Sequence, residues 1–181
     1  MYSFALIGMT GQGKSRYAHR MIKEDTECNV MVWDVNNEYG THPTNPEWSL
    51  HLSTNINSAR CRYTGGDPGK FIELCGLKRD CIIVFEEATA FFKGQIGKNL
   101  VELVIRKRHT NNRYVFLFHS IRAIPPALLD FLNYVILFKT SDNIQIVKDK
   151  HHLLLQPLMQ LQKMKTGRSL LLPFLAPYCE T

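Results

Sequence analysis

The sequence predicts an α/β fold in which a mainly parallel central sheet is flanked by helices. Three observations predict it. A short apolar strand at residues 4–7 runs directly into a glycine-rich loop and then into a helix. A second stretch, residues 81–85, is apolar throughout, as a strand buried on both faces of a parallel sheet has to be. Further apolar segments of strand length follow along the chain, between segments with helical spacing of apolar residues.

The helices are predicted by apolar spacing and by start signals. Residues 14–24 place apolar side chains at helical spacing and basic side chains on the other face. Asp67 before Pro68 is typical of an N-cap followed by proline in the first turn. The expected helices in the first part of the chain are residues 14–24, 68–76, 95–110 and 125–131.

The strands are predicted by short apolar runs between turn residues. The expected strands are residues 4–7, 30–33, 59–63 at an edge, 81–85, 114–118, 134–138 and 144–147. Beyond residue 148 the chain is rich in leucine, and Pro157 interrupts the first part. We expect a helix there, then a turn at Gly167 and a short terminal strand at residues 170–172.

Length and charge indicate one domain with a basic surface. At 181 residues the chain is long enough to bury a core that needs no covalent staples, so we expect a single domain at 1–181. Its core is expected at about residues 3–140, with a C-terminal extension at 148–181. Lys and Arg number 22 against 16 acidic residues, a net charge of +6. This excess favours a polyanionic partner, and simple solubility is the alternative explanation.

The cysteines and the apolar segments indicate a cytoplasmic protein. The five cysteines are odd in number and form no C-x-x-C pair, so neither a disulfide framework nor a zinc site is predicted. Lys14 ends the first apolar stretch too early for a signal peptide. No window approaches the length of a transmembrane helix, so no membrane-spanning segment is expected.

Residues 8–15 match G-x-x-x-x-G-K-S, the Walker A phosphate-binding loop. Gly8 and Gly13 let the backbone turn tightly, so that its N–H groups converge on a triphosphate. Lys14 is expected to reach the β- and γ-phosphates of ATP, and the Ser15 hydroxyl to ligate Mg²⁺. A glycine turn that binds nothing is the alternative, but the strand before and the helix after favour the nucleotide. The expected ATP-binding residues are Gly8, Met9, Thr10, Gly11, Gln12, Gly13, Lys14, Ser15 and Arg16.

The strand at 81–85 ends in two adjacent carboxylates, Glu86 and Glu87, which is the pattern of a Walker B strand. Side chains at the carboxyl end of a parallel strand emerge beside a phosphate-binding loop. Glu86 is expected to hold the hydration shell of Mg²⁺ together with Ser15, and Glu87 to polarise the attacking water. The alternative is a core strand whose acids only meet solvent.

Residues 93–122 carry seven Lys or Arg and one acid, the most one-sided charge in the chain. Cations near a helix C-terminus suit its dipole, which is the simplest explanation. The segment also follows the Glu86 strand, so we expect it to supply a DNA contact and an arginine finger, with Arg106, Arg108 or Arg113 reaching into a neighbour's site. His119 ends the next strand, where it could sense the γ-phosphate or be a satisfied interior group.

Taken together, these motifs resemble the additional-strand, catalytic-glutamate class of P-loop ATPases, whose members share a RecA-like sheet. Within that class the chain resembles the FtsK/HerA superfamily of DNA-pumping ATPases over roughly residues 4–138. The residues that carry this resemblance are Trp33-Asp34 through Glu38-Tyr39, the doubled Glu86-Glu87, His119-Ser120 and Ile124-Pro125.

The compact length is similar to that of the genome-packaging ATPases of viruses with internal membranes. The resemblance implies ATP hydrolysis at subunit boundaries of a hexameric or pentameric ring, translocation of DNA, and contact with capsid or vertex proteins. Location in the host cytoplasm or with the virion would follow. Two residues depart from the pattern: Glu86 stands where the family usually has Asp, and His119 where it usually has Gln.

Other functions remain open at this stage. The zonula occludens toxin family of filamentous-phage assembly ATPases has a similar Walker B, although its members usually carry a membrane segment. A small-molecule or nucleotide kinase would also use Walker A, but would need a lid over its acceptor. The third alternative is a module that binds ATP only to assemble.

Overall fold

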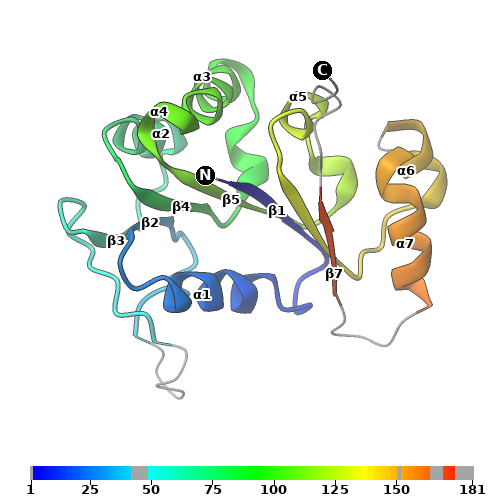
Figure 1. Ribbon diagram of the computed structural model, residues 1–181, viewed down its shortest axis with the longest axis horizontal. Coiled ribbons are helices and arrows are strands. Elements are labelled where there is room, and N and C mark those ends of the chain that lie inside the picture. Colours follow the sequence, from blue (N-terminus) through cyan, green and yellow to red (C-terminus); the bar gives the residue numbers. More distant parts are fainter. Residues whose placement is uncertain (1, 42–48, 151, 164–168, 174–181) are drawn as a thin grey trace.

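The computed structural model describes residues 2–41, 49–150, 152–163 and 169–173. One twisted sheet runs through it, with the strand order β3-β2-β4-β5-β1-β6-β7 (Figure 1). Neighbouring strands from β3 to β6 are parallel, and β7 pairs antiparallel with β6. The strands are β1 (Ser3–Ile7), β2 (Asn29–Trp33), β3 (Arg60–Tyr63), β4 (Cys81–Phe85), β5 (Arg113–Phe118), β6 (Tyr134–Phe138) and β7 (Ser169–Pro173).

Helices cover both faces of the sheet unequally. Among the described helices, α1 lies on one face of the sheet and α2 to α5 lie on the other (Figure 1). Helices α6 and α7 contribute to the same core layer as α2 to α5, at the β6-β7 side of the sheet. The helices are α1 (Lys14–Glu24), α2 (Pro68–Gly76), α3 (Gly94–Ile105), α4 (Lys107–Thr110), α5 (Pro126–Leu129), α6 (Ile144–Lys150) and α7 (Leu155–Gln162). Short 3₁₀ turns form η2 (Ala88–Phe91), η3 (Ile121–Ala123) and η4 (His152–Leu154).

The apolar core is divided by the sheet into two layers. On the α1 side, Ala18 and Ile22 pack against Leu6, Val32 and Val84. The other layer is larger and rich in aromatic rings, which stack or meet edge to face. Its buried aromatic residues include Trp33, Phe71, Phe85, Phe91, Tyr114, Phe116 and Phe118. Because the central strands are buried on both faces, the continuous apolar runs in the sequence are explained.

The position of β5 sets the geometry of the functional edge. β5 lies between β1 and β4, so the strand that leads into the glycine-rich loop is separated from the strand that ends at Glu86. The loop is also tied to its neighbours: the Gly8 N–H donates to the Phe118 carbonyl (3.0 Å) and the Met9 N–H to the Lys139 carbonyl (3.0 Å). A Cβ on Gly8 would lie 2.6 Å from the Cβ of Phe138, so only glycine fits there.

The expected strand at 144–147 is wrong, since this segment belongs to α6. The Asn143 side chain accepts the Gln145 N–H (2.7 Å), and the Asn143 carbonyl accepts the Val147 N–H (3.2 Å), so a helix starts there. β-branched residues favoured a strand in the sequence, but β7 already pairs with the outer edge of β6. Val147 is buried, whereas Ile144, in the first turn of α6, is exposed.

Three other helices differ in detail from expectation. The helix expected at 125–131 is the shorter α5, Pro126–Leu129. The helix expected at 95–110 is divided at Arg106, whose backbone (φ −74°, ψ 0°) ends α3 and precedes α4. Pro157 does not interrupt a helix but lies within the first turn of α7, where a missing N–H costs little. The terminal strand is confirmed as β7, and the expected turn at Gly167 lies outside the described residues.

Candidate functional site

The loop between β1 and α1 is shaped around its lysine. Gly11 (φ 78°) and Gly13 (φ 97°) adopt the left-handed conformation that glycine tolerates. The Lys14 ammonium donates to the carbonyls of Gly8 (2.8 Å) and Met9 (3.1 Å), so it lies across the loop. Burial lowers the pKa of Lys14, and the carboxylates of the site oppose that shift.

The amino end of α1 faces the same loop. Its N-cap residue is Gly13, which has no side chain. No side chain among the described residues therefore caps the first N–H groups of this helix. The first N–H groups of a helix carry a partial positive charge and need acceptors. An anion within the loop would supply such acceptors, so this end of α1 suits a phosphate group.

Glu86 is held from two sides at the end of β4. The Ser15 hydroxyl donates to Oε1 of Glu86 (2.5 Å), and the Tyr39 hydroxyl donates to Oε2. Burial raises the pKa of Glu86 to about 7, although both hydrogen bonds and the nearby Lys14 favour its charged form. Burial also raises the pKa of Tyr39 well above its usual value, so the phenol keeps its proton for this bond.

The Ser15 hydroxyl and the Glu86 carboxylate fit a magnesium ion chemically. Both are hard oxygen donors and they lie within hydrogen-bond distance of each other. Mg²⁺ is bound in nucleotide sites through one or two such protein oxygens, with water and phosphate oxygens completing the octahedron. Ser15 would ligate the ion and Glu86 would accept hydrogen bonds from its water molecules, as the sequence predicts.

Glu87 and His119 meet because β4 and β5 are neighbours. His119 Nε2 lies 3.0 Å from Oε1 and 3.1 Å from Oε2 of Glu87. The Glu87 side chain keeps 36% of its surface exposed and the His119 side chain keeps 47%, so water can reach both. A carboxylate oriented by an imidazole and open to water can accept a proton from that water.

These side chains share one cleft of about 570 Å³. The residues that line it are Thr10, Gly11, Gly13, Lys14, Ser15, Arg16, Asn36, Glu38, Glu86, Glu87 and His119. Of the predicted site residues, the structure therefore brings together Lys14, Ser15, Glu86, Glu87 and His119, with part of the glycine loop. Asn36 and Glu38 also line the cleft, and sequence reasoning assigned them no role. Their position just after β2, beside the end of β4, is the signal that could have found them.

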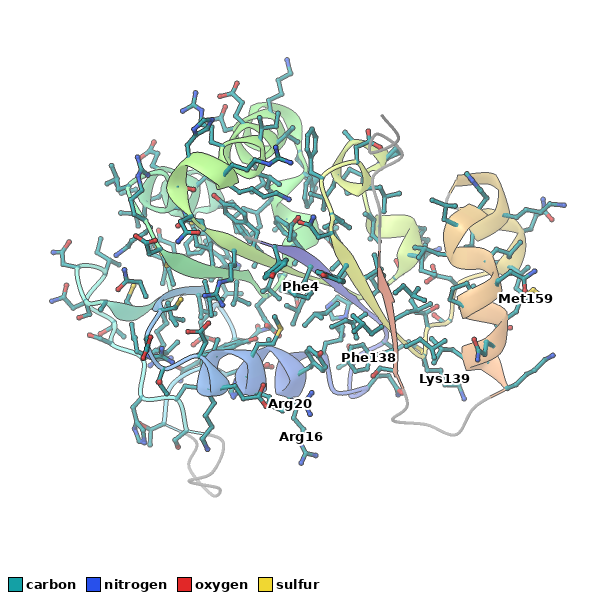
Figure 2. The ribbon with its side chains drawn as sticks, in the orientation of Figure 1. Phe4, Arg16, Arg20, Phe138, Lys139 and Met159 are labelled. Carbon is teal, nitrogen blue, oxygen red and sulfur yellow. The ribbon has the colours of Figure 1, made fainter. Side chains whose placement is uncertain are left out.

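A second cavity of about 740 Å³ adjoins the cleft and shares Gly11, Gly13 and Arg16 with it. Arg16 and Arg20 extend from α1 on the side of the sheet where Phe138 also lies (Figure 2). The residues that line this cavity are Gly11, Gln12, Gly13, Arg16, Tyr17, His19, Arg20, Lys23, Leu50, Phe138 and Ser169. The cavity is large enough for a nucleoside whose phosphates occupy the cleft.

The three candidate arginines lie away from this chain's own cleft. Arg113 begins β5, whereas His119 follows the other end of that strand. Arg113 is also occupied, since it forms an ion pair with Asp25 and donates to Cys28 Sγ (2.8 Å). Arg106 and Arg108 are exposed where α3 meets α4, beside the amino end of β5. An action of any of the three on a neighbouring subunit's nucleotide stays a prediction.

Among the described residues, no helix combines the length and the apolarity that crossing a membrane requires.

Known structures resemble this fold, whereas no protein-family model and no curated protein matches the sequence. The genome packaging NTPase B204 from Sulfolobus turreted icosahedral virus 2, in complex with ATP-γ-S, matches with a TM-score of 0.73 and 14% identity over 96% of this chain and 92% of that chain. The DNA-packaging ATPase B204 from Sulfolobus turreted icosahedral virus matches with a TM-score of 0.72 and 11% identity over the same shares, 96% and 92%.

EssC (ATPases 2 and 3) from Geobacillus thermodenitrificans matches more weakly, with a TM-score of 0.59 and 13% identity over 95% of this chain and 37% of that chain. At these identities the likeness shows the fold. The P-loop NTPase fold predicted from the sequence is confirmed, and the structure resembles viral genome-packaging ATPases.

Glu86→Gln is expected to make stability less dependent on pH. Since folding raises the pKa of Glu86 from 4.5 to about 7, the folded state holds a proton that the unfolded state releases between these values. Wild-type stability therefore falls as pH rises through this range, by on the order of 3 kcal/mol. Glutamine carries no charge, so the stability of the variant relative to wild type should be greater at about pH 8 than at about pH 5.

Urea unfolding without nucleotide or Mg²⁺ at both pH values measures this difference. Glu73→Gln on the exposed side of α2 controls for the change in net charge. The same stability difference at both pH values would contradict the assignment of the pH dependence to Glu86.

Proposed function

We propose that this chain is an ATP-hydrolysing nucleic-acid motor, of the kind that packages viral DNA. The observation that carries the proposal is the shared cleft, in which Lys14, Ser15, Glu86 and Glu87 converge on one edge of the sheet. The similar fold of B204, whose structures include one with ATP-γ-S, supports it. A kinase would need an acceptor site in addition, and a module that only assembles would not need Glu87.

Hydrolysis would use each side chain for one task. Lys14 and the amino end of α1 would neutralise the β- and γ-phosphates. Ser15 and Glu86 would hold Mg²⁺, which supplies charge stabilisation between the phosphates. Glu87 would accept a proton from the water that attacks the γ-phosphorus, and His119 would keep the Glu87 carboxylate oriented through their hydrogen bond.

The nucleoside would occupy the second cavity, which Gly13 lines and Glu86 does not. Tyr17 offers an aromatic surface there, over which the Arg20 guanidinium lies at 5.0 Å, and its ring meets Phe138 edge to face at 6.2 Å. Aromatic and guanidinium planes stack well on purine rings. This assignment supports a nucleoside triphosphate such as ATP, because the cavity and the phosphate cleft share Gly11, Gly13 and Arg16.

The missing positive charge would come from a neighbouring subunit of a ring. Charge develops on the γ-phosphoryl oxygens in the transition state, and an arginine finger typically accelerates the reaction by about 10³- to 10⁵-fold. The ion pair with Asp25 makes Arg113 a weaker candidate. The exposed Arg106 and Arg108 are the better ones, and the same basic segment would contact DNA in the ring's channel.

Lys14→Ala is expected to abolish ATP binding, because the triphosphate loses its main counter-charge. Glu87→Gln is expected to bind ATP but to hydrolyse it more slowly by on the order of 10²-fold or more. Calorimetry with ATP and a phosphate-release assay measure the two effects. Equal ATP affinity in wild type and Lys14→Ala would exclude this nucleotide site, and normal turnover of Glu87→Gln would assign water activation elsewhere.

Arg108→Ala is expected to leave ATP affinity nearly unchanged and to lower the rate of hydrolysis by on the order of 10³-fold. Mixing this variant with Glu87→Gln should restore part of the activity, since a mixed ring contains sites with Glu87 from one subunit and Arg108 from the next. Arg106→Ala is tested in the same way. If no mixture recovers hydrolysis, a site shared between subunits is wrong.

DNA is expected to stimulate hydrolysis and to bind with little sequence preference, because a motor holds the backbone of every sequence it passes. Its affinity should fall steeply with salt, as phosphate contacts release counterions. Lys93→Gln with Lys98→Gln, two exposed residues of the same basic segment that are not finger candidates, should reduce the slope of log affinity against log salt by about 2. Lys163→Gln, at the end of α7, should leave the slope unchanged. Salt-independent binding would contradict the DNA contact.

A further inference from the structure

We infer that Tyr39 is a positioning residue for the Mg²⁺-nucleotide, because its buried hydroxyl holds the Glu86 carboxylate in the orientation that Ser15 and the ion require. This inference rests on the proposed function. It gives a chemical task to the loop after β2, to which the hydrolysis steps above assign none. It also explains how a glutamate can serve at the end of β4.

The geometry around Glu86 carries the inference. Its two carboxylate oxygens are used separately: Oε1 accepts from Ser15 at 2.5 Å, and Oε2 accepts from Tyr39. A glutamate has one more rotatable bond than an aspartate, so its carboxylate has more orientations to lose. Two donors, one on each oxygen, select a single orientation, in which the Oε1 edge faces Ser15 and the cleft.

Tyr39 is itself held firmly, as a positioning residue has to be. Its side chain is fully buried, and its ring lies 4.4 Å from that of His19 on α1. Its backbone N–H donates to Asp34 Oδ2 at 3.1 Å, and the Glu38 N–H donates to Asp34 Oδ1 at 2.7 Å. The Asp34 carboxylate is therefore the anchor of the loop that carries Tyr39.

Asp34 is fixed in turn from the edge of the sheet. Arg62 on β3 donates to Asp34 Oδ2 at 2.9 Å, and it also donates to Asn37 in the same loop. The Asp34 side chain has no exposed surface, so this ion pair compensates a fully buried charge. A continuous chain of contacts thus runs from Arg62 through Asp34 and Tyr39 to Glu86, across β3, β2 and β4.

A hydrogen bond donated to a carboxylate stabilises its ionised form, which is the form that accepts hydrogen bonds from metal-bound water. Residues in the second layer around a metal, such as Glu86, usually change its affinity by about 10- to 100-fold when they are removed, and Tyr39 acts on the metal through Glu86. Loss of the Tyr39 hydroxyl should therefore weaken the divalent cation and leave the metal-free contacts of the nucleotide intact.

The test compares Tyr39→Phe with Tyr114→Phe. Both substitutions remove one hydroxyl from a fully buried ring, and the Tyr114 hydroxyl donates to the Leu103 carbonyl at 3.2 Å, away from the cleft. Electron paramagnetic resonance measures the affinity of Mn²⁺ for the protein saturated with ATP-γ-S. Calorimetry measures the affinity of ATP-γ-S without a divalent cation, and urea unfolding measures stability.

Tyr39→Phe is expected to bind Mn²⁺ up to about 10-fold more weakly than wild type, since it acts through Glu86, with metal-free ATP-γ-S affinity unchanged. Tyr114→Phe should lose stability but keep wild-type Mn²⁺ affinity. Unchanged Mn²⁺ affinity in folded Tyr39→Phe overturns the inference, and so does an equal loss in both variants, since that would reflect general loosening.

A second variant covers the case in which Tyr39→Phe does not fold. Arg62→Gln keeps the Tyr39 hydroxyl and removes the ion pair that anchors Asp34, so it should weaken Mn²⁺ in the same direction; wild-type affinity in this variant overturns the inference. Wild type that binds no Mn²⁺ with ATP-γ-S would overturn the proposed function as well. If wild type binds Mn²⁺ and hydrolyses ATP, and Tyr39→Phe has the same Mn²⁺ affinity as wild type, only the role of Tyr39 is overturned.

Discussion

The buried carboxylate of Glu86 is the group on which the geometry of the cleft depends. It joins three segments that are far apart in the chain: Ser15 lies 71 positions away and Tyr39 lies 47 positions away. A carboxylate in an apolar sheet is costly unless donors compensate it, and burial raises the pKa of this one to about 7. The two hydroxyl donors reduce that cost. They also fix how the end of β4 sits against α1 and against the loop after β2.

The order of the strands explains why the cleft has two chemical halves. Because β5 lies between β1 and β4, Glu86 faces the start of α1, whereas Glu87 turns toward His119 at the end of β5. The half beside Lys14 suits phosphate and metal, and the exposed half beside His119 suits water. One parallel sheet thus brings the amino end of α1 and the exposed Glu87 carboxylate together at its carboxyl edge.

Several elements could be predicted from local signals alone. Helix α1 has the bounds that its apolar spacing indicated. Helix α2 starts at Pro68, after the N-cap Asp67, whose side chain accepts the N–H groups of Gly69 (2.9 Å) and Lys70 (3.3 Å). The strand prediction for residues 144–147 was wrong because β-branched residues are compatible with a strand or a helix. The choice between them depended on the pairing of β7 with β6. A local pattern cannot reveal which distant segment has already taken a sheet edge.

The sequence by itself determined the glycine loop, the lysine and serine that follow it, and the two carboxylates at the end of an apolar strand, because each depends on spacing along the chain. Only the tertiary structure decided that Tyr39 donates to Glu86, that His119 meets Glu87, and that Arg113 is occupied by Asp25. These contacts depend on strand order and on the reach of single side chains. Both are set by how the chain folds back on itself, since hydrogen bonds between distant residues leave no periodic trace in a sequence.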